Sequence, residues 1–418
     1  MSNNGIIIIG AGIAGVSAAY YLNRAGYEVT IIEKSSGRDN CSYGNAGMIV
    51  PSHIIPLSSP GMISKGLRWM LDAESPFYIR PRLSLDLLQW LWKFKQSSTE
   101  KHVEESGPLL RDLLMASRDL LIQIELDVEI DFSFKKKGLF MFCNTDYGLS
   151  KEIEIAKKAL NLGIPAEILS PEEVKKLEPA LDIKIVGATY YPNDAHIHPG
   201  SLMEKLKSII EKRGVRISYN TQVTDIITNG EKVESVITSD NQTFTGKTFI
   251  NCAGAWSSSF MSMADRKLLL QAGKGYSITL ENPPVRPDYC GILSEKKVTL
   301  TPMYNSLRFA GTMEIVGTDT SVNPKKISGL KNSVLEYLPQ FEAEDLEGHE
   351  VWTGLRPCSP DGLPYVGAVA GYSNFYTSTG HAMMGMSLAP SSGKLLADLV
   401  MYGKSELNSD LISPNRFN

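Results

Sequence analysis

The chain has 418 residues, of which 43% are hydrophobic and 21% charged, a composition that excludes a disordered or fibrous protein. At this length we expect two domains or one large composite. The formal net charge is −4 and no long block of Lys and Arg appears, so we expect no nucleic-acid partner. Five cysteines without CxxC spacing favour a reducing, cytoplasmic compartment over a disulfide framework or a structural zinc.

The first 33 residues combine a strand, a glycine-rich turn, a helix and a second strand. Residues Ile6–Ile9 predict a buried strand of a parallel sheet, Ile13–Ala25 a helix, and Glu28–Glu33 the second strand. Residues 5–22 carry no charge, which raises the question of a membrane span. The residues before them bring no positive charge, and the glycine spacing has a better explanation, so we reject the span.

Glycines 10, 12 and 15 have the GxGxxG spacing of a dinucleotide-binding turn. Gly10 permits the tight turn, Gly12 lets the backbone approach a pyrophosphate, and Gly15 lets the helix pack on the strand. The helix N-terminus offers its N–H groups to the phosphates, and Glu33 can accept hydrogen bonds from ribose hydroxyls. An acid at this position disfavours NADP, while the choice between NAD and FAD stays open on these residues.

Four later segments have an unusual composition. A loop of small residues spans Cys41–Gly47, and an apolar strand, Thr248–Cys252, runs into Ala-Gly-Ala-Trp-Ser. A stretch rich in turn residues, including Gly-Leu-Arg-Pro and Pro-Asp-Gly, spans Trp352–Pro364. The segment Ser378–Pro390 opens a helix that we expect to continue to about Met401.

These segments resemble, in their order, those of the D-amino-acid oxidase superfamily of FAD-dependent oxidoreductases. From Gly5 to about Leu399 the chain is most similar to the D-amino-acid dehydrogenase branch. The resemblance implies an α/β (α+β) two-domain flavoprotein, with a Rossmann-like FAD-binding domain and an interleaved substrate domain built on a mainly antiparallel sheet. It places the FAD-binding domain at residues 1–88, 190–262 and 348–405, the substrate domain at 89–189 and 263–347, and a C-terminal tail at 406–418.

The resemblance also implies which residues contact FAD. They are Gly10, Gly12, Ile13, Ala14, Gly15, Glu33, Lys34, Ser42, Asn45, Ala46, Gly47, Val223, Ala253, Gly254, Trp256, Gly354, Arg356, Gly380, His381, Met384 and Gly385. The turn before the last helix would aim N–H groups at the flavin edge that becomes negative on reduction, although such a turn can also merely cap a helix. A related sarcosine-oxidising branch carries flavin on a cysteine near Cys358, but the local pattern differs, so we expect non-covalent FAD.

Four residues are candidates for contact with the substrate. A carboxylate in a dry site calls for an arginine, and Arg308 and Arg356 match the positions where the superfamily places one. We rank Arg308 first and expect Arg308→Ala to lose activity while FAD stays bound; without the resemblance, a strand arginine is more often a solvated surface residue. His53 would hold the substrate amine unprotonated, and Tyr276 follows Gly275 in an apolar run.

No metal site is predicted. His196 and His198 have HxH spacing, which would put both rings on one side of a strand, but the neighbouring sequence supplies no further ligands.

The resemblance implies oxidative deamination of D-amino acids, including D-proline or hydroxy-D-proline as candidates. The Cα hydride would pass to the flavin, the imino acid would hydrolyse to a 2-oxo acid and ammonia, and a quinone or other non-oxygen acceptor would take the electrons. The alternatives are an oxygen-using amine oxidase of the glycine, sarcosine or D-amino-acid type and a flavin-binding protein without turnover.

Residues 56–102 are the candidate membrane contact. They combine six aromatic residues with seven basic and four acidic ones, a local excess of three positive charges. Such a surface can lie on the inner face of the cell membrane and would suit electron transfer to quinone, although aromatic residues on helices more often belong to the core.

Overall fold

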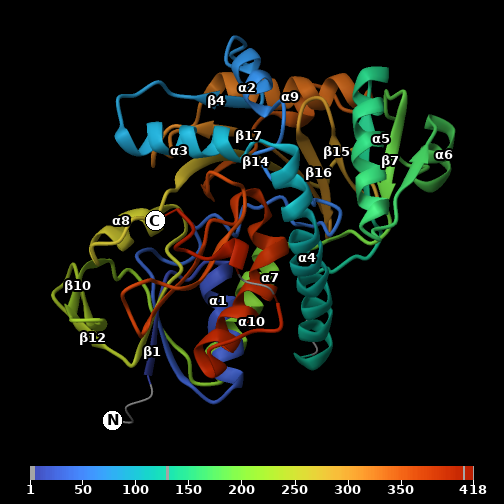
Figure 1. Ribbon diagram of the computed structural model, residues 1–418. Coiled ribbons are helices and arrows are strands. Elements are labelled where there is room, and N and C mark those ends of the chain that lie inside the picture. The colour runs from blue at the N-terminus through green and yellow to red at the C-terminus, as the bar shows by residue number, and fades with distance from the viewer. Residues whose placement is uncertain (1–4, 129–130, 408–409, 418) are drawn as a thin grey trace.

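The computed structural model describes residues 5–128, 131–407 and 410–417, which form two units that meet across one cavity. In the view of Figure 1, the unit that holds the N-terminal strand lies below and the unit that holds the largest sheet lies above. Helix α4 (Glu100–Val128) extends along both.

The lower unit is built on a six-stranded sheet in the order β19-β20-β13-β1-β2-β9. Its strands are β1 (Gly5–Ile9), β2 (Glu28–Ile32), β9 (Arg216–Ser218), β13 (Thr248–Asn251), β19 (Tyr365–Ala368) and β20 (Phe375–Thr379). All neighbours are parallel except β19 and β20. Because both faces of β1 are covered, its four isoleucines form an uninterrupted buried run.

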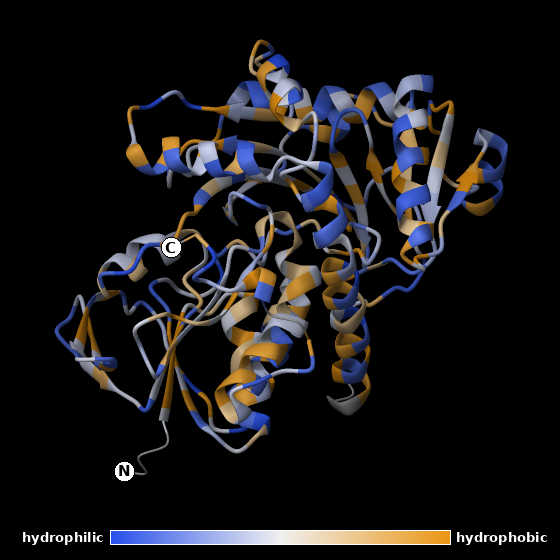
Figure 2. Ribbon diagram, in the orientation of Figure 1, coloured by the Kyte–Doolittle hydropathy of each residue, from blue (hydrophilic) through white to orange (hydrophobic). Residues whose placement is uncertain are grey.

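Different layers cover the two faces of this sheet. Ile6 and Ile8 pack with α1 (Ile13–Arg24), α7 (Pro199–Lys212) and α10 (Gly385–Tyr402). Ile7 and Ile9 pack with the three-stranded sheet of β10 (Val223–Asn229), β11 (Lys232–Thr238) and β12 (Thr243–Thr245), and with α8 (Ser257–Ser262). Figure 2 shows that α1 and α10 are largely hydrophobic, as helices buried inside a unit should be.

The upper unit is built on a nine-stranded sheet in the order β18-β14-β17-β16-β15-β5-β7-β6, with β4 paired to β17. The strands are β4 (Phe77–Ile79), β5 (Leu139–Cys143), β6 (Glu167–Leu169), β7 (Gly187–Tyr191), β14 (Gln271–Glu281), β15 (Cys290–Leu293), β16 (Val298–Met303), β17 (Ser306–Ile315) and β18 (Val351–Cys358). Only the β5–β15 and β4–β17 pairings are parallel, so the mainly antiparallel sheet is confirmed. Helix α9 (Pro324–Tyr337) packs on its outer face.

Most predicted elements are present, and one is different. The helix predicted at Ile13–Ala25 corresponds to α1, and the helix expected to continue to about Met401 corresponds to α10. Further helices are α3 (Leu85–Ser97), α4, α5 (Asp146–Asn161) and α6 (Pro171–Leu177). The segment expected to be turn-rich at Trp352–Cys358 is instead β18, because its Gly354 and Pro357 pair with Gly275 and Ala272 of β14 and do not break the ladder. His196 lies in β8 (Ala195–His196), which pairs with β3 (Met48–Ile49), whereas His198 caps α7.

Sheet membership differs from the expected domain boundaries at three strands. By sequence, β4, part of β7 and β18 were placed with the FAD-binding domain, yet all three pair within the nine-stranded sheet. The chain therefore passes between the two units at about residues 191 and 358.

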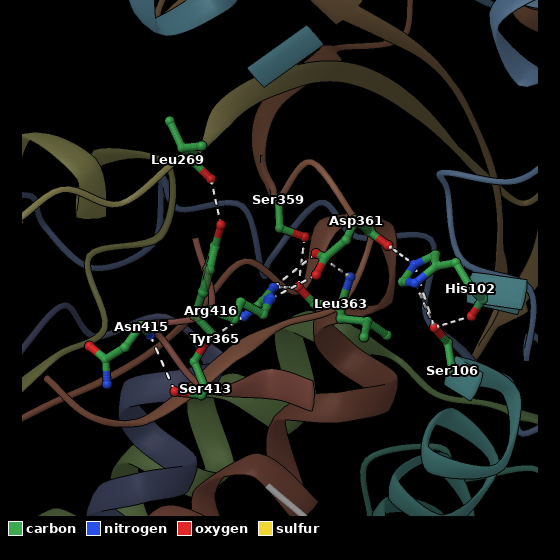
Figure 3. Close-up of polar contacts among 10 residues, drawn as sticks. All are labelled: His102, Ser106, Leu269, Ser359, Asp361, Leu363, Tyr365, Ser413, Asn415 and Arg416. Atoms are coloured by element: carbon green, nitrogen blue, oxygen red, sulfur yellow. Dashed lines mark hydrogen bonds and ion pairs between the residues drawn. The ribbon is translucent and has the colours of Figure 1, made fainter. Parts of the chain in front are cut away.

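The C-terminal segment is packed against the lower unit rather than extending as a tail (Figure 3). The Arg416 guanidinium binds both carboxylate oxygens of Asp361, at 2.7 and 2.9 Å, and donates to the Leu363 carbonyl at 2.8 Å. Its carbon lies 3.9 Å from the Tyr365 ring centroid. His102 of α4 contacts the Asp361 carbonyl from the other side. The Arg416–Asp361 pair thus joins the C-terminal segment to the turn that follows β18.

We expect Arg416→Ala to lower the free energy of unfolding by about 3–5 kcal/mol, because it leaves the Asp361 carboxylate buried without its cation. The side chains of Arg416 and Asp361 are only 11% and 7% exposed. The matched control is Arg38→Ala, which removes a pair that is 76% and 52% exposed and should change stability by less than about 0.5 kcal/mol. Equal effects of the two substitutions in urea unfolding would contradict this interpretation.

Candidate cofactor and substrate site

A cavity of about 410 Å³ lies at the carboxyl ends of β1, β2 and β13, where the two units meet. Its walls come from the glycine-rich turn, the Cys41–Asn45 loop, residues 221–223, the segment after β13, the end of β18 and the start of α10. The crevice at the carboxyl ends of parallel strands is where α/β sheets bind dinucleotides.

The glycine-rich turn has the geometry that its spacing predicts. Gly10 has a φ of +104°, and its N–H donates to the Ile32 carbonyl at 2.8 Å. A Cβ at Gly15 would lie 1.9 Å from the Gly10 carbonyl oxygen, so only glycine lets α1 pack this closely. A Cβ at Gly12 would meet only Ser42 Oγ, at 3.6 Å, so this side of the turn stays open for a ligand.

Glu33 lies buried at the end of β2 and connects the turn to the strand. Its Oε2 accepts from the Ala11 N–H at 2.7 Å, and its Oε1 accepts from the N–H and hydroxyl of Ser35 at 3.0 and 2.8 Å. Next to it, Lys34 Nζ lies 3.0 Å from the Trp256 ring centroid. These contacts orient an acid toward the cavity at the place where a ribose is bound in this type of fold.

The start of α10 forms the opposite wall. Burial lowers the pKa of His381 to about 4, so the ring is neutral, and its Nε2 lies 3.0 Å from Ser392 Oγ. Ala382 has a φ of +47°, an uncommon conformation for a residue with a side chain. Ser378 belongs to the cavity lining, and its Oγ is buried without a hydrogen-bond partner among the described residues.

Arg356 is the more buried of two cations in the cavity wall, the other being Lys34. Its Nη1 donates to the Thr312 carbonyl at 2.7 Å, and its Nη2 lies 3.5 Å from the Gly311 carbonyl. The guanidinium lies against Gly275, where a Cβ would come within 1.9 Å of Nη1. Burial lowers the pKa of Arg356, yet no carboxylate pairs with it in the described part of the chain. A half-buried cation without an acidic partner favours binding of an anion.

Arg308 lies behind the loop Ser42–Gly47, which we call the flavin loop, and does not line the cavity. Its Nη1 donates to the carbonyls of Tyr43 and Asn45, at 3.0 and 2.7 Å, and its Nε donates to Thr279 Oγ1 at 2.9 Å. Burial lowers the pKa of Arg308 to about 10, so it remains a cation at neutral pH.

Tyr276 faces the other side of the sheet, contrary to the expectation from sequence. Its hydroxyl donates to Glu314, which also lies 3.6 Å from the buried Lys274 amine. Side chains alternate along a strand, so Gly275 and Ser277 point toward the flavin loop and Arg356 while Tyr276 points to the outer face. Tyr276 is therefore part of the buried network under α9 and not of the cavity.

His53 also lies outside the cavity lining. Its Nδ1 is 3.2 Å from Ser52 Oγ, which donates to the buried carboxylate of Asp194. Burial, reinforced by Lys297, lowers the pKa of His53 to about 4.

The structure places most of the expected FAD contacts in one cavity. Those in its wall are Gly10, Gly12, Ile13, Ala14, Glu33, Lys34, Ser42, Asn45, Val223, Ala253, Gly254, Trp256, Arg356, His381 and Gly385. The expected residues that lie beside the wall are Gly15, Ala46, Gly47, Gly354, Gly380 and Met384.

The wall also contains residues that the sequence did not single out. Thr221 and Gln222 directly precede Val223, and Cys41 directly precedes Ser42. The signal for them in the sequence was therefore their position next to residues expected to contact FAD. Ser259 lies in α8 and Met263 directly after it, both following the Ala-Gly-Ala-Trp segment, and no residue pattern marks them.

The comparison with protein families decides what this arrangement is. The DAO family, described as FAD dependent oxidoreductase, matches residues 5–399. The chain belongs to the DAO family. As a DAO-family member it is an FAD-dependent oxidoreductase, in agreement with the expectation from sequence.

Two relatives and two solved structures illustrate the similarity. A D-amino acid dehydrogenase of Helicobacter pylori is 30% identical over 408 residues, which cover 97% of both chains. One of Neisseria meningitidis is 30% identical over 422 residues, covering 99% of both chains. Glycine oxidase from Geobacillus kaustophilus has a TM-score of 0.79 at 22% identity, covering 98% of both chains. L-proline dehydrogenase from P. horikoshii has a TM-score of 0.74 at 18% identity, covering 99% and 98%. These two structures share the fold.

The cavity fits the FAD that a DAO-family protein requires. It offers an open approach at Gly12, a buried acid at the end of β2 and an unpartnered hydroxyl at Ser378. Burial raises the pKa of Cys41, and it raises those of Cys252 and Cys358 to about 12, which favours the protonated thiols over the nucleophilic thiolates.

We expect Gly12→Ala to fold normally and to weaken FAD binding by at least about tenfold, or roughly 1.4 kcal/mol, because the methyl group occupies the approach of the pyrophosphate. Gly15→Ala should destabilise the protein itself, since its Cβ meets backbone. Gly5→Ala is the control, with no atom within 4 Å of the added Cβ. Titrating each apoprotein with FAD tests this, and wild-type affinity in Gly12→Ala would contradict the assignment.

Proposed function

We propose that this DAO-family protein oxidises D-amino acids to imino acids, which water hydrolyses to 2-oxo acids and ammonia. The relatives named D-amino acid dehydrogenase, which align over nearly the whole chain, support this substrate class. The structural observation that carries the proposal is Arg356: a half-buried cation in the cofactor cavity with carbonyl contacts and no acidic partner among the described residues.

The chain's own residues would hold FAD without a covalent bond. The first turn of α1 would face the pyrophosphate, Glu33 the ribose, and the start of α10 the flavin. Bound FAD supplies the acceptor for the Cα hydride. The protein then has only to bind and orient the substrate, because hydride transfer to a positioned flavin needs no protein nucleophile.

Arg356 would bind the substrate carboxylate. Two backbone carbonyls and the Gly275 surface fix its guanidinium in one place, which lowers the entropy lost on binding. An arginine beside a carboxylate in a dry cavity forms charge-assisted hydrogen bonds that define orientation as well as affinity.

We do not propose His53 as the base for the substrate amine. A ring with a pKa of about 4 holds a proton too weakly to take one from an ammonium group near neutral pH. Its contacts with Ser52 and, through it, Asp194 are those of a buried structural histidine.

We further propose that a quinone or another non-oxygen acceptor removes the electrons, in line with the word dehydrogenase in the relatives' names. An oxygen-using amine oxidase is the alternative, since glycine oxidase has the same fold. Arg356, which has no acidic partner among the described residues, argues against a flavin-binding protein without turnover, in which such a cation would have no ligand.

We expect Arg356→Met to keep FAD and to lower kcat/KM for D-amino acids by about 100-fold or more, as loss of a buried charge pair does. The ratio of kcat/KM for a D-amino acid over its amide should collapse in this variant, because only the acid has the carboxylate. Arg266→Met, which alters an arginine bound to the Ala370 carbonyl at the surface, is the control. A wild-type ratio in Arg356→Met would contradict the assignment.

We also propose that helices α2 (Met62–Trp69) and α3 contact an anionic membrane at the inner face of the cell membrane. The α2–α3 surface exposes Leu67, Leu71, Leu83, Leu85, Leu88 and Trp92. Leu71 and Leu83 are 90% and 105% exposed, and Lys65, Arg68 and Lys93 lie among these residues in the sequence. Beside α3, a groove of about 490 Å³ reaches Pro414 and Phe417. In the described residues no helix is long and apolar enough to cross a bilayer.

We expect the protein to sediment with vesicles that contain phosphatidylglycerol and much less with phosphatidylcholine alone. Leu71→Glu combined with Leu85→Glu should lower the bound fraction at least tenfold, since each leucine contributes about 1.5–3 kcal/mol when buried. Leu160→Glu is the control, because Leu160 is 50% exposed on α5, outside the α2–α3 surface. Equal sedimentation of all variants, or none of the wild type, would contradict a membrane contact here.

A further inference from the structure

The loop from Ser42 to Gly47 lies between the two units and contributes Ser42 and Asn45 to the cavity wall. On the side of the lower unit, Ser42 Oγ accepts a hydrogen bond from the Ile13 N–H, at the first turn of α1, at 3.0 Å. Within the loop, the Asn45 side chain accepts from the Gly47 N–H at 2.8 Å. One end of the loop is thus tied to the helix that faces the pyrophosphate.

On the side of the upper unit, three successive carbonyls of the flavin loop accept hydrogen bonds from the nine-stranded sheet. Arg308 Nη1 donates to the carbonyls of Tyr43 and Asn45, at 3.0 and 2.7 Å. Ser277 Oγ donates to the carbonyl between them, that of Gly44, at 3.1 Å. Such a run of contacts fixes the path of the loop backbone and not merely one side chain.

The sheet in turn holds Arg308 in the orientation that these contacts need. Arg308 of β17 pairs with Thr279 of β14, and its Nε donates to Thr279 Oγ1 at 2.9 Å. Trp352 of β18 closes the third side, because a Cβ at Gly44 would lie 1.9 Å from its ring. The indole therefore lies directly on the loop backbone, and the loop is confined by three strands.

The donors of Arg308 are largely committed to these partners. Each edge of a guanidinium offers two nitrogens to a carboxylate: Nη1 with Nη2, or Nε with Nη2. Nη1 binds two loop carbonyls and Nε binds Thr279, so each edge of Arg308 already has a nitrogen in use. Arg356, by contrast, lines the cavity, and one of its two carbonyl contacts, from Nη2 to Gly311, is long at 3.5 Å.

We propose that Arg308 is a positioning residue that fastens the flavin loop to the nine-stranded sheet and thereby sets the affinity for FAD. This inference deepens the proposed function, in which Arg356 alone binds the substrate carboxylate. Loss of Arg308 would release the Tyr43 and Asn45 carbonyls, and with them the part of the cavity wall formed by Ser42 and Asn45. The expectation from sequence, that Arg308→Ala keeps FAD bound, is reversed.

The test measures FAD binding to the apoprotein and, separately, carboxylate binding to the FAD-loaded protein. Arg308→Met should raise the Kd for FAD at least tenfold and shift the absorption spectrum of the resting flavin. The same variant, saturated with FAD, should bind benzoate, a carboxylate without an oxidisable Cα–H, with a Kd within about threefold of wild type. Arg356→Met should show the reverse pattern.

Two conservative variants keep the test decisive if Arg308→Met does not fold. Thr279→Val removes the acceptor of Nε and Ser277→Ala removes the donor to Gly44, and each should raise the Kd for FAD by about twofold to fivefold. Thr224→Val, which removes a hydroxyl on the surface of β10, is the control and should leave it unchanged. Wild-type FAD affinity in the Arg308, Thr279 and Ser277 variants, with benzoate binding lost in Arg308→Met, would overturn the proposal. These readouts need no turnover, so they remain valid if no D-amino acid proves to be a substrate.

Discussion

Two guanidinium groups lie half-buried where the two sheets meet, and neither is paired with a carboxylate in the described part of the chain. Burying a cation without an acid costs several kcal/mol unless dipoles or a ligand compensate. Here backbone carbonyls supply the compensation: those of Tyr43 and Asn45 for Arg308, and that of Thr312 for Arg356. The junction of the two units depends on these contacts, and the cavity is shaped around them.

Backbone geometry makes these contacts possible. Thr312 has a φ of +67°, next to the irregularity where the pairing of β14 and β17 shifts register, and its carbonyl points to Arg356. Gly275 leaves the surface on which the Arg356 guanidinium rests, and Gly44 leaves the surface on which Trp352 rests. A strained residue and two missing side chains are thus concentrated at the site, as expected where function outweighs local stability.

The local sequence predicted the cofactor half of the site well. The glycine-rich turn, Glu33 and the segment before α10 are recognisable because each consists of consecutive residues whose chemistry follows from their spacing. The four-isoleucine strand follows in the same way from its uninterrupted apolar run. These features form within about 30 residues, so little depends on how distant segments pair.

The substrate half of the site depends on which strands pair with one another, and the local sequence does not reveal this. Alternation along β14 implies that Tyr276 and Gly275 face opposite ways, but only the position of the sheet between α9 and the flavin loop decides which one faces the cavity. The Gly-Leu-Arg-Pro segment has turn composition and becomes a strand because β14 lies beside it. Arg308 was correctly placed on a strand, but its partners are carbonyls more than 260 residues earlier in the chain.

The most direct test of the central claim is the visible spectrum of the purified holoenzyme under anaerobic conditions, recorded while D- and L-amino acids are added one at a time, D-proline and hydroxy-D-proline among them. The account predicts a flavin spectrum that bleaches with at least one D-amino acid and not with its L-isomer, and that returns on addition of a quinone analogue. A flavin that no D-amino acid bleaches would contradict the proposed function, although the fold and the FAD site would stand.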